Sequence, residues 1–310
     1  MKNLLFLFLI FSVTEIFSQG TATIHMDQYG FPVEQRENAA YYLVVSADTL
    51  PGLYRVNEFY MSDTLKQTGT YLDPDLFIRQ GIFISYHPNG MIKSERNFEM
   101  NEEKGIAKYR YANGQLKEIR THDGKNIMVQ TFYDSLGKVM VKNGAGTYTL
   151  KEEEVGYTNK HITLVGPVRN GYKNGLFTGY LSDGTTYCKE EYINDQLVQG
   201  ISYHDGKEFP YNNLTDPAFY QRLMDHIRKT MRYPASARRN GVDGTVYVRM
   251  LLNKDYSVKK VYLMKTVSKD IDAEAIRVIK DSGFKFGPII KRGQLHEYIV
   301  YVLPLKFKLG

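Results

Sequence analysis

The chain has 310 residues, one cysteine and a formal net charge of +6. The single cysteine, Cys188, excludes an internal disulfide framework, and the length suits two domains of about 100 to 200 residues each. From Arg222 to the end, 19 Lys and Arg stand against 8 Asp and Glu, so this part carries +11 and the rest of the chain carries −5. The sequence therefore predicts two domains of opposite charge. The basic one suits an acidic partner or an anionic membrane surface, with attraction between the two halves or a solvated basic face as the alternatives.

The N-terminal segment has the layout of a secretory signal. Lys2 precedes about ten apolar residues, which are followed by the polar and small residues of TEIFSQG. The apolar run ends at Thr14, well short of the about 20 residues that a membrane helix needs. We expect cleavage near residues 18–20 and a periplasmic location, with an uncleaved anchor as the alternative. Export makes a nucleic-acid partner unexpected.

The region from residue 52 to 210 repeats one pattern, in which an aromatic strand, a turn and a returning strand follow each other. Asn-Gly and Asp-Gly tolerate the positive φ angles of tight hairpins, so each copy predicts a β-hairpin. One hairpin is marginal in water, and we therefore expect an all-β array of stacked hairpins. The turn residues of the copies are Asn89-Gly90, Asn113-Gly114, Gly137, Asp183-Gly184 and Asp205-Gly206.

Few side chains in the array are candidates for chemistry. His87, His122 and His204 each precede a turn, and aligned turns would stack them into a ladder able to bind a metal. We favour local hydrogen bonding at the turns instead, so no metal or other cofactor is expected. The acidic run Glu152 to Glu154 is interpreted as a solvated loop, and Cys188, in TTYCKEEY, as a buried strand residue. Nucleophile and phosphate-loop motifs are missing, so we expect no catalytic residue and no enzyme activity.

The pattern changes at residue 211. Asp216 and Pro217 suit the start of a helix that carries Phe219, Leu223, Ile227 and Met231 at intervals of four, and that ends before Pro234. TVYVRMLL alternates like a half-buried strand, VKKVYLMK returns antiparallel, IDAEAIRVIKDS is an amphipathic helix and EYIVYVLPLKFKL is a final strand. The expected fold is an α+β C-terminal domain, a three-stranded antiparallel sheet with two helices, following the all-β repeat array.

Both parts resemble known families. The repeat G-x-[FY]-x-x-Y-x-x-[ND]-G-x-[LI]-K-x-E resembles the MORN-repeat variant of bacterial envelope proteins over roughly residues 52 to 210. This resemblance implies a binding or spacer surface with no catalytic residue. A second series of motifs runs in the order YP, A-x-R-x-x-G-x-x-G-x-V-x-V, V-x-x-V-x-L-x-K, D-x-E-A-I-R-V-I-K and L-P-L-K-F-K-L. This series resembles the TonB C-terminal domain over about residues 217 to 309, in the form common among energy-transducer homologues of Bacteroidetes type.

The second resemblance implies a way of binding. Domains of this family add the TonB box of an outer-membrane transporter as a strand to an exposed sheet edge. By position, the partner-binding residues would be Thr230, Met231, Arg232, Tyr233, Val300 and Val302. Tyr233 and Pro234 are interpreted first as packing and helix-stop residues, and Asp272, Glu274 and Arg277 as capping and salt-linking the second helix.

The chain departs from an energy transducer in two ways. A transducer carries an uncleaved membrane helix and a long proline-rich spacer, whereas this chain has a short signal and ten prolines. We therefore expect a signal peptide over 1–20, repeats over 21–210 and a TonB-like domain over 211–310, in a non-catalytic periplasmic interaction protein. Its partner would be an outer-membrane TonB-dependent receptor or another envelope protein. The alternative is a structural or glycan-binding envelope adaptor. An exposed sheet edge also permits a homodimer.

Overall fold

The computed structural model describes residues 20–309 except 124–125, 154–160, 213–216, 254, 256, 281–288 and 297–299. The side chains of 153, 217–220, 289–291, 294–296 and 300 also lie outside the description. The predicted signal peptide falls outside the described residues, apart from Gly20. Within the described ranges, no helix is long and apolar enough to cross a membrane.

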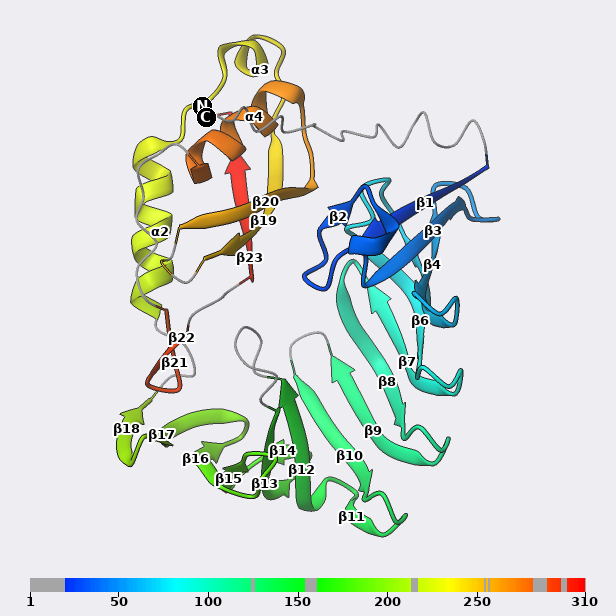
Figure 1. Ribbon diagram of the computed structural model, residues 1–310, viewed down its shortest axis with the longest axis vertical. Helices are drawn as coiled ribbons and strands as arrows, with labels where there is room; N and C mark the ends of the chain where they lie inside the picture. The colour runs from blue at the N-terminus through cyan, green and yellow to red at the C-terminus, as the bar shows by residue number, and fades with distance from the viewer. Residues whose placement is uncertain are drawn as a thin grey trace. The chain divides into compact units, whose positions relative to one another are not determined.

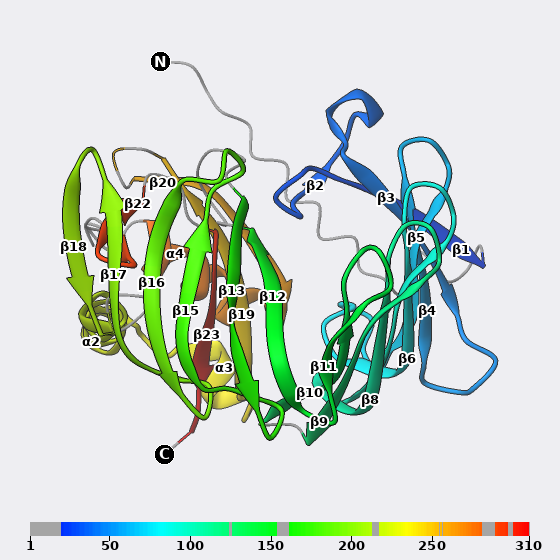
Figure 2. The same ribbon diagram turned by 90° about the horizontal axis from the view of Figure 1, so that it is seen from below.

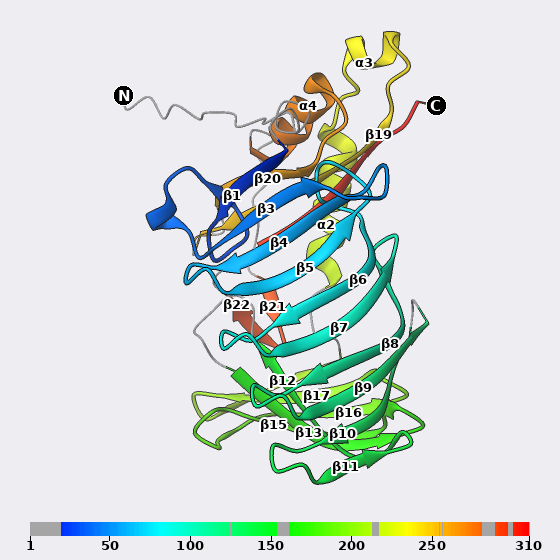
Figure 3. The same cartoon turned by 90° about the vertical axis from the view of Figure 1, so that its right-hand side faces the viewer.

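The contacts divide the chain into two units, Met1–Lys104 with Arg110–Gly114 and Gly105–Tyr109 with Gln115–Gly310. In the first unit, β1 pairs antiparallel with β2 and β3, and the ladder then runs strand by strand from β3 to β7 (Figure 3). Strand β8 (Glu102–Arg110) contributes residues to both units. The elements of the first unit are β1 (Thr21–Met26), β2 (Pro32–Val33), the 3-10 helix η2 (Arg36–Asn38), β3 (Tyr41–Ala47), β4 (Tyr54–Tyr60), β5 (Leu65–Tyr71), β6 (Arg79–Tyr86) and β7 (Ile92–Glu99).

The second unit begins with a ladder of the same kind, in which β9 to β18 pair antiparallel in chain order and β13 pairs with both β14 and β15 (Figure 2). These ladders confirm the predicted all-β hairpin array. The strands are β9 (Leu116–Asp123), β10 (Ile127–Tyr133), β11 (Val139–Lys142), β12 (Ala145–Glu153), β13 (His161–Arg169), β14 (Tyr172–Lys173), β15 (Gly175–Tyr180), β16 (Thr186–Ile193), β17 (Gln196–His204) and β18 (Lys207–Tyr211).

The two residues of an Asn-Gly turn in the array have different backbone conformations. Gly90 has a φ of +82° and donates its N–H to His87 O at 2.8 Å, whereas Asn89 keeps a negative φ and accepts a hydrogen bond from Met91 N at 3.2 Å. This is a type I turn closed by a left-handed glycine. Only the glycine of this Asn-Gly pair therefore needs the left-handed region.

Within the array core, two aromatic rings lie directly on glycines of neighbouring strands. A Cβ added at Gly166 would lie 2.4 Å from the ring of Phe177, and one at Gly69 would lie 2.4 Å from the ring of Phe83. Glycine in a strand interior marks such a close approach. Cys188 is fully buried in this core, which confirms the prediction for TTYCKEEY.

The C-terminal part of the second unit is an α+β layer, as predicted (Figure 1). A three-stranded antiparallel sheet has the order β20-β19-β23, and a two-stranded hairpin, β21–β22, was not predicted because three residues per strand are too few to show alternation. The elements are α2 (Pro217–Thr230), α3 (Ala235–Arg239), β19 (Gly244–Leu252), β20 (Val258–Lys265), α4 (Lys269–Lys280), β21 (Ile289–Lys291), β22 (Gln294–His296) and β23 (Val300–Phe307).

The two long helices and the sheet share one aliphatic core. Leu223 and Ile227 of α2 are buried at the predicted spacing, and Met231 packs partly buried just after the helix ends. The side chain of Phe219, the fourth predicted position, lies outside the described side chains. Buried residues of the other elements complete the core: Val246, Val248, Met250 and Leu252, then Ile271, Ala275, Val278 and Ile279, then Leu303, Leu305 and Phe307.

Candidate functional site

Strand β23 forms one edge of the three-stranded sheet. Among the described strands it pairs with β19 alone, from Leu251↔Val300 to Gly244↔Phe307. Its core-facing side chains are buried, whereas Val302 on the opposite face is 43% exposed. An edge strand with an apolar exposed residue is a template for pairing with an extended segment.

Pro304 indicates which backbone groups point outward from this edge. It pairs with Tyr247 of β19 in register, and proline is placed in edge strands so that its missing N–H faces away from the partner strand. The N–H and C=O of one strand residue point to the same side, and the side alternates along the strand. Val300, Val302 and Lys306 therefore share the outward direction of Pro304, which gives the two predicted valines outward-facing donors and acceptors.

The opposite edge is less suited to pairing. Strand β20 carries Lys259, Lys260 and Lys265 within its eight residues, and lysines on an edge strand oppose strand addition. The apolar edge of β23 is therefore the better candidate of the two.

The other predicted contact segment, Thr230 to Tyr233, uses its backbone internally. Met231 N donates to Ile227 O at 2.8 Å, and Thr230 O accepts from Arg277 Nη2 at 2.8 Å. The hydroxyl of Thr230 donates to His226 O, also at 2.8 Å. These groups stabilise the end of α2 and are already engaged, so they offer nothing to a bound strand.

Arg232 is held by α4 through its backbone, while its side chain is exposed. Its N–H donates to Glu274 Oε1 at 2.6 Å, and the same carboxylate pairs with Arg277 Nε at 2.7 Å. Partial burial raises the pKa of Glu274, but the hydrogen bonds from Arg277 and Arg232 outweigh it and hold that pKa below its usual value. The predicted salt link of the second helix is present, and it also fixes the segment that follows α2.

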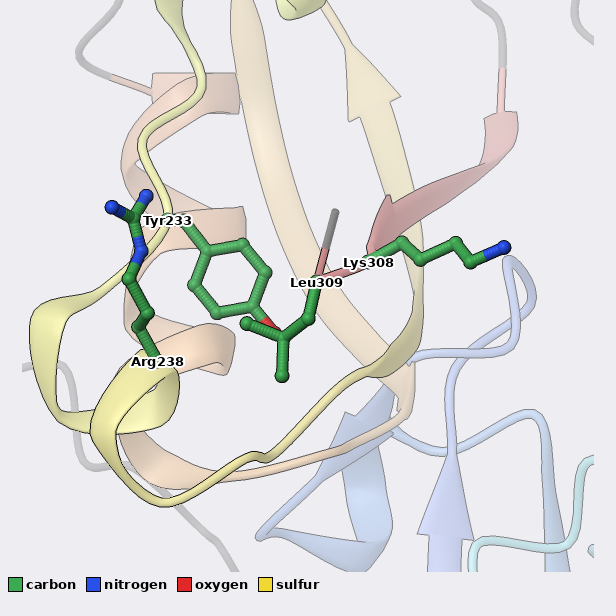
Figure 4. Close-up of a pocket in the computed structure, with 4 residues that line it drawn as sticks. All are labelled: Tyr233, Arg238, Lys308 and Leu309. Carbon is green, nitrogen blue, oxygen red and sulfur yellow. The ribbon is translucent and has the colours of Figure 1, made fainter.

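Tyr233 is a packing residue at the end of β23. Its hydroxyl donates to Val242 O at 2.6 Å, and its ring meets Phe307 edge-to-face with centroids 6.0 Å apart. Arg238 lies over the ring at 5.7 Å. A pocket opens beside the ring of Tyr233. In this pocket the ring is directed toward Leu309, and Arg238 and Lys308 lie on either side of it (Figure 4). Its lining residues are Tyr233, Arg238, Lys308 and Leu309.

The predicted residues therefore fall into two groups. Tyr233 meets β23 at Phe307, whereas Val302 lies five residues earlier, roughly 17 Å away at about 3.3 Å per residue. Val300, of which only the backbone is described, is farther still. The structure places the segment Thr230 to Tyr233 at one end of β23 and the two valines toward the other end.

The histidines that precede the turns have separate environments. His87 Nε2 lies 3.0 Å from Arg110 O, His204 Nε2 lies 3.0 Å from Asp205 Oδ2, and His122 is buried. Within the residues that the structure describes, no group of three or more His, Cys, Asp or Glu is placed to hold a metal ion.

A buried ion cluster was missed at the sequence level. Glu152 lies in strand β12, and its Oε2 pairs with Arg292 Nη2 at 2.6 Å, so the interpretation of this acidic run as a solvated loop is wrong at Glu152. Glu154 lies outside the described residues. Arg292 also pairs with Glu190 at 2.6 Å. The partners are separated by 140 and 102 residues, beyond the reach of local patterns.

Comparisons with known proteins agree with this fold. Residues 229–309 match the model of the Gram-negative bacterial TonB protein C-terminal, and residues 79–100 and 103–123 match the model of the MORN repeat variant. The comparison with curated proteins found no match. Both resemblances and their order along the chain are confirmed. Residues 229–309 are therefore similar to the TonB C-terminal domain, which is a kind of domain that mediates protein–protein interactions.

Proposed function

We propose that this chain is an exported, non-catalytic interaction protein of the periplasm. Its C-terminal domain binds an extended segment of a partner, the TonB box of an outer-membrane transporter or a similar segment, by adding it as a strand to β23. The observation that carries the proposal is the edge position of β23, with Val302 exposed and Pro304 leaving outward donors on either side of it. The binding residues are Val300 and Val302.

The end of β23 adds specificity to this proposal. The pocket residues Arg238 and Lys308 place cationic groups beside Tyr233 at the end of β23, and the exposed Arg232 precedes Tyr233 in the chain. Such groups suit an acidic side chain or a terminal carboxylate of the bound segment. In this proposal Tyr233 contributes its ring as a wall of the pocket, and Thr230 and Met231 hold the segment in place without touching the partner.

The proposal assigns residues 1–20 to a signal peptide, 21–210 to the array and 211–310 to the binding domain. The array acts as a spacer or as a second binding surface. The charge of +11 from Arg222 onward favours one competing function, an adaptor for an acidic glycan polymer of the envelope. Contacts between exposed charges are screened within about 8 Å at physiological ionic strength, so salt separates the two functions.

The test is a titration of the chain without its signal with a panel of TonB-box peptides, at low and high salt. We expect saturable binding that tolerates salt. Val302→Pro removes one outward donor and should weaken binding about tenfold or more, a change of about 1.4 kcal/mol per tenfold. Val302→Thr is the matched control, because threonine is also β-branched and keeps the N–H, and it should bind like the wild type.

Two outcomes would oppose the proposal. Equal binding by Val302→Pro and Val302→Thr, with both variants folded, would remove β23 as the site. Binding of an acidic polymer that disappears at high salt, with no peptide bound at either salt, would favour the adaptor instead.

A further inference from the structure

The turn of the β21–β22 hairpin inserts into the hairpin array. Arg292 is fully buried, although it belongs to a two-residue turn with Gly293, both at positive φ. Its Nε lies 2.6 Å from Glu190 Oε1, its Nη2 lies 2.6 Å from Glu152 Oε2, and its carbonyl oxygen accepts a hydrogen bond from Ser202 Oγ at 2.6 Å. Figures 1 and 2 show the hairpin beside β17 and β18.

The receiving site is built around Glu190. This carboxylate is fully buried, and its two oxygens accept hydrogen bonds from Tyr211 OH and Tyr192 OH, each at 2.8 Å. Among the described residues, the guanidinium of Arg292 is the cation paired with it. A buried carboxylate is costly unless it is both paired and hydrogen-bonded, so this site is complete only while the turn occupies it.

One guanidinium spans strands that are not neighbours. Glu152 lies on β12 and Glu190 on β16, and the ladder between them passes through β13 and β15. Strands lie about 4.8 Å apart, so a flat sheet would separate the two strands by roughly 14 Å. Arg292 bridges this separation, and the residues around it form a socket, defined by Glu152, Glu190, Tyr192, Ser202 and Tyr211, that fits a planar cation with donors on two sides.

The repeat pattern itself changes at this socket. Aligning the copies from Gly81, Gly105 and Gly175 places Arg96, Arg120 and Glu190 at one position. The strand registers agree, because Phe83 pairs with Arg96 and Phe177 pairs with Glu190. The array thus replaces its own arginine with a glutamate at the one copy where a guanidinium arrives from residue 292.

The turn fits the socket closely. A Cβ added at Gly293 would lie 3.0 Å from the Cβ and 3.1 Å from the carbonyl oxygen of Phe209, and its φ of +73° already favours glycine. Gly293 therefore satisfies the backbone angle and the space, and Arg292 supplies the charge.

We propose that this socket is a docking site for an arginine-bearing β-turn, and that its occupant is the chain's own Arg292–Gly293 turn, which fastens the C-terminal domain to the array. β22 ends at His296 and β23 begins at Val300, so the fastened hairpin lies close in sequence to the proposed binding strand. A partner strand bound to β23 would then be connected to the array through the docked hairpin. This consequence rests on the proposed function, whereas the docking itself does not.

The first test is hydrogen exchange on the full chain without any partner peptide. Glu190→Arg introduces the residue that stands at Arg96 and Arg120 in two other copies of the array, and here it places two guanidinium groups where they repel each other. Amides of residues 289–296 should then exchange faster by on the order of 100-fold, as removal of a buried partner implies, and those of β13 to β16 should not. Arg292→Ala should give the same release, and Arg239→Ala, at an exposed arginine of α3, should exchange like the wild type.

The second test supplies the turn from outside. A cyclised peptide with the sequence of residues 289–296 should bind the full-length Arg292→Ala chain and bind the wild type at least about tenfold more weakly, because the wild-type socket is occupied. The same peptide with alanine in place of its arginine is the control and should not bind.

Three results would overturn the docking. Unchanged exchange of residues 289–296 in both Glu190→Arg and Arg292→Ala would show that the turn is not held by this socket. Equal binding of the arginine and alanine peptides would show that the guanidinium is not recognised. Protection of residues 289–296 that rises with protein concentration would assign the turn to a second copy. Loss of TonB-box binding leaves all three measurements unchanged, so the two proposals fail separately.

Discussion

The hairpin array and the C-terminal domain bury their residues by different means. In the array, rings such as Phe177 lie directly on glycines of the next strand, and carboxylates are buried between tyrosines and arginines. In the C-terminal domain, aliphatic side chains from α2 and α4 fill one face of a sheet whose edge strands each pair with one of the described strands. The array therefore tolerates few added atoms, while the domain retains an edge for a partner.

Two buried carboxylates of the array take their arginine partners from different regions. Glu118 pairs with Arg120 of its own strand at 2.7 Å and accepts a hydrogen bond from Tyr148 OH at 2.7 Å. Glu190 accepts hydrogen bonds from two tyrosine hydroxyls, and its paired arginine belongs to the C-terminal domain. The same local chemistry is satisfied within the array at one site and across the two regions at the other.

The largest expected effect comes from removing the shared cation. Arg292→Ala leaves Glu190 buried without its partner and should lower the free energy of unfolding by about 3 to 5 kcal/mol. Denaturant unfolding of the full chain measures it. Arg239→Ala, at an exposed arginine, should stay within about 0.5 kcal/mol of the wild type, and a similar small loss in Arg292→Ala would show that the buried pair contributes little.

The C-terminal core should be destabilised by removing atoms, whereas the array core should be destabilised by adding them. Leu305→Ala removes a buried side chain of the C-terminal domain and should cost about 2 to 5 kcal/mol. Gly166→Ala adds one methyl group against the ring of Phe177 and should cost about 1 to 3 kcal/mol. Phe177→Leu in the Gly166→Ala background should recover part of that loss, and a neutral Gly166→Ala would contradict the ring-on-glycine packing.

The contribution of Glu190 to the free energy of unfolding should depend on pH with opposite sign in the wild type and in Arg292→Ala. Burial raises the pKa of this carboxyl, but Arg292 and the tyrosine hydroxyls outweigh it and hold the pKa below its usual value. In the wild type this group therefore stabilises the fold above its unfolded pKa, and that stability is lost as the pH falls through the folded pKa. In Arg292→Ala the turn is released, but the strands and tyrosine rings of the array still surround Glu190 while the cation is gone. The folded pKa therefore rises above the unfolded one, and the fold is penalised as the pH rises.

The measurement is unfolding of both proteins at about pH 5 and about pH 8. The deficit of Arg292→Ala should be larger at the higher pH. Adding Glu190→Gln to the variant should abolish this difference. An equal deficit at both pH values would show that Glu190 does not depend on Arg292 for its ionisation.

The smallest expected effect concerns thiol reactivity. Burial, aided by the charge of Glu190, raises the pKa of Cys188 to about 12, so alkylation at about pH 8 requires the array to open. Gly166→Ala should raise the labelling rate, whereas Leu305→Ala should leave it within about twofold if the C-terminal domain opens by itself. Equal acceleration by both substitutions would show that the two regions open together.

The sequence predicts the parts of this molecule that depend on local periodicity. Alternation and turn glycines are sufficient for the array, and a spacing of four, with Pro234, is sufficient for α2. The contacts of Arg292 depend on residues more than 100 positions away, so no local pattern contains them. One signal for them exists in the repeats, where Glu190 stands at the position of Arg96 and Arg120.

The candidate site shows the same limit. The resemblance placed Thr230 to Tyr233 among the contact residues, because a motif gives positions and not hydrogen bonds. The backbone bonds to Ile227, Arg277 and Glu274 that occupy this segment become visible only in three dimensions. By contrast, Pro304 indicates which residues of β23 direct their backbone N–H and C=O away from β19, once this strand is known to be an edge.

The proposed function requires that a partner segment pairs with β23. Hydrogen exchange of the full chain with and without a saturating TonB-box peptide measures this pairing residue by residue. We expect new protection at the amides of Val300, Val302 and Lys306, with the amides of Val258–Lys265 unchanged. Binding of the peptide with no protection along β23, or with protection along β20 instead, would contradict it.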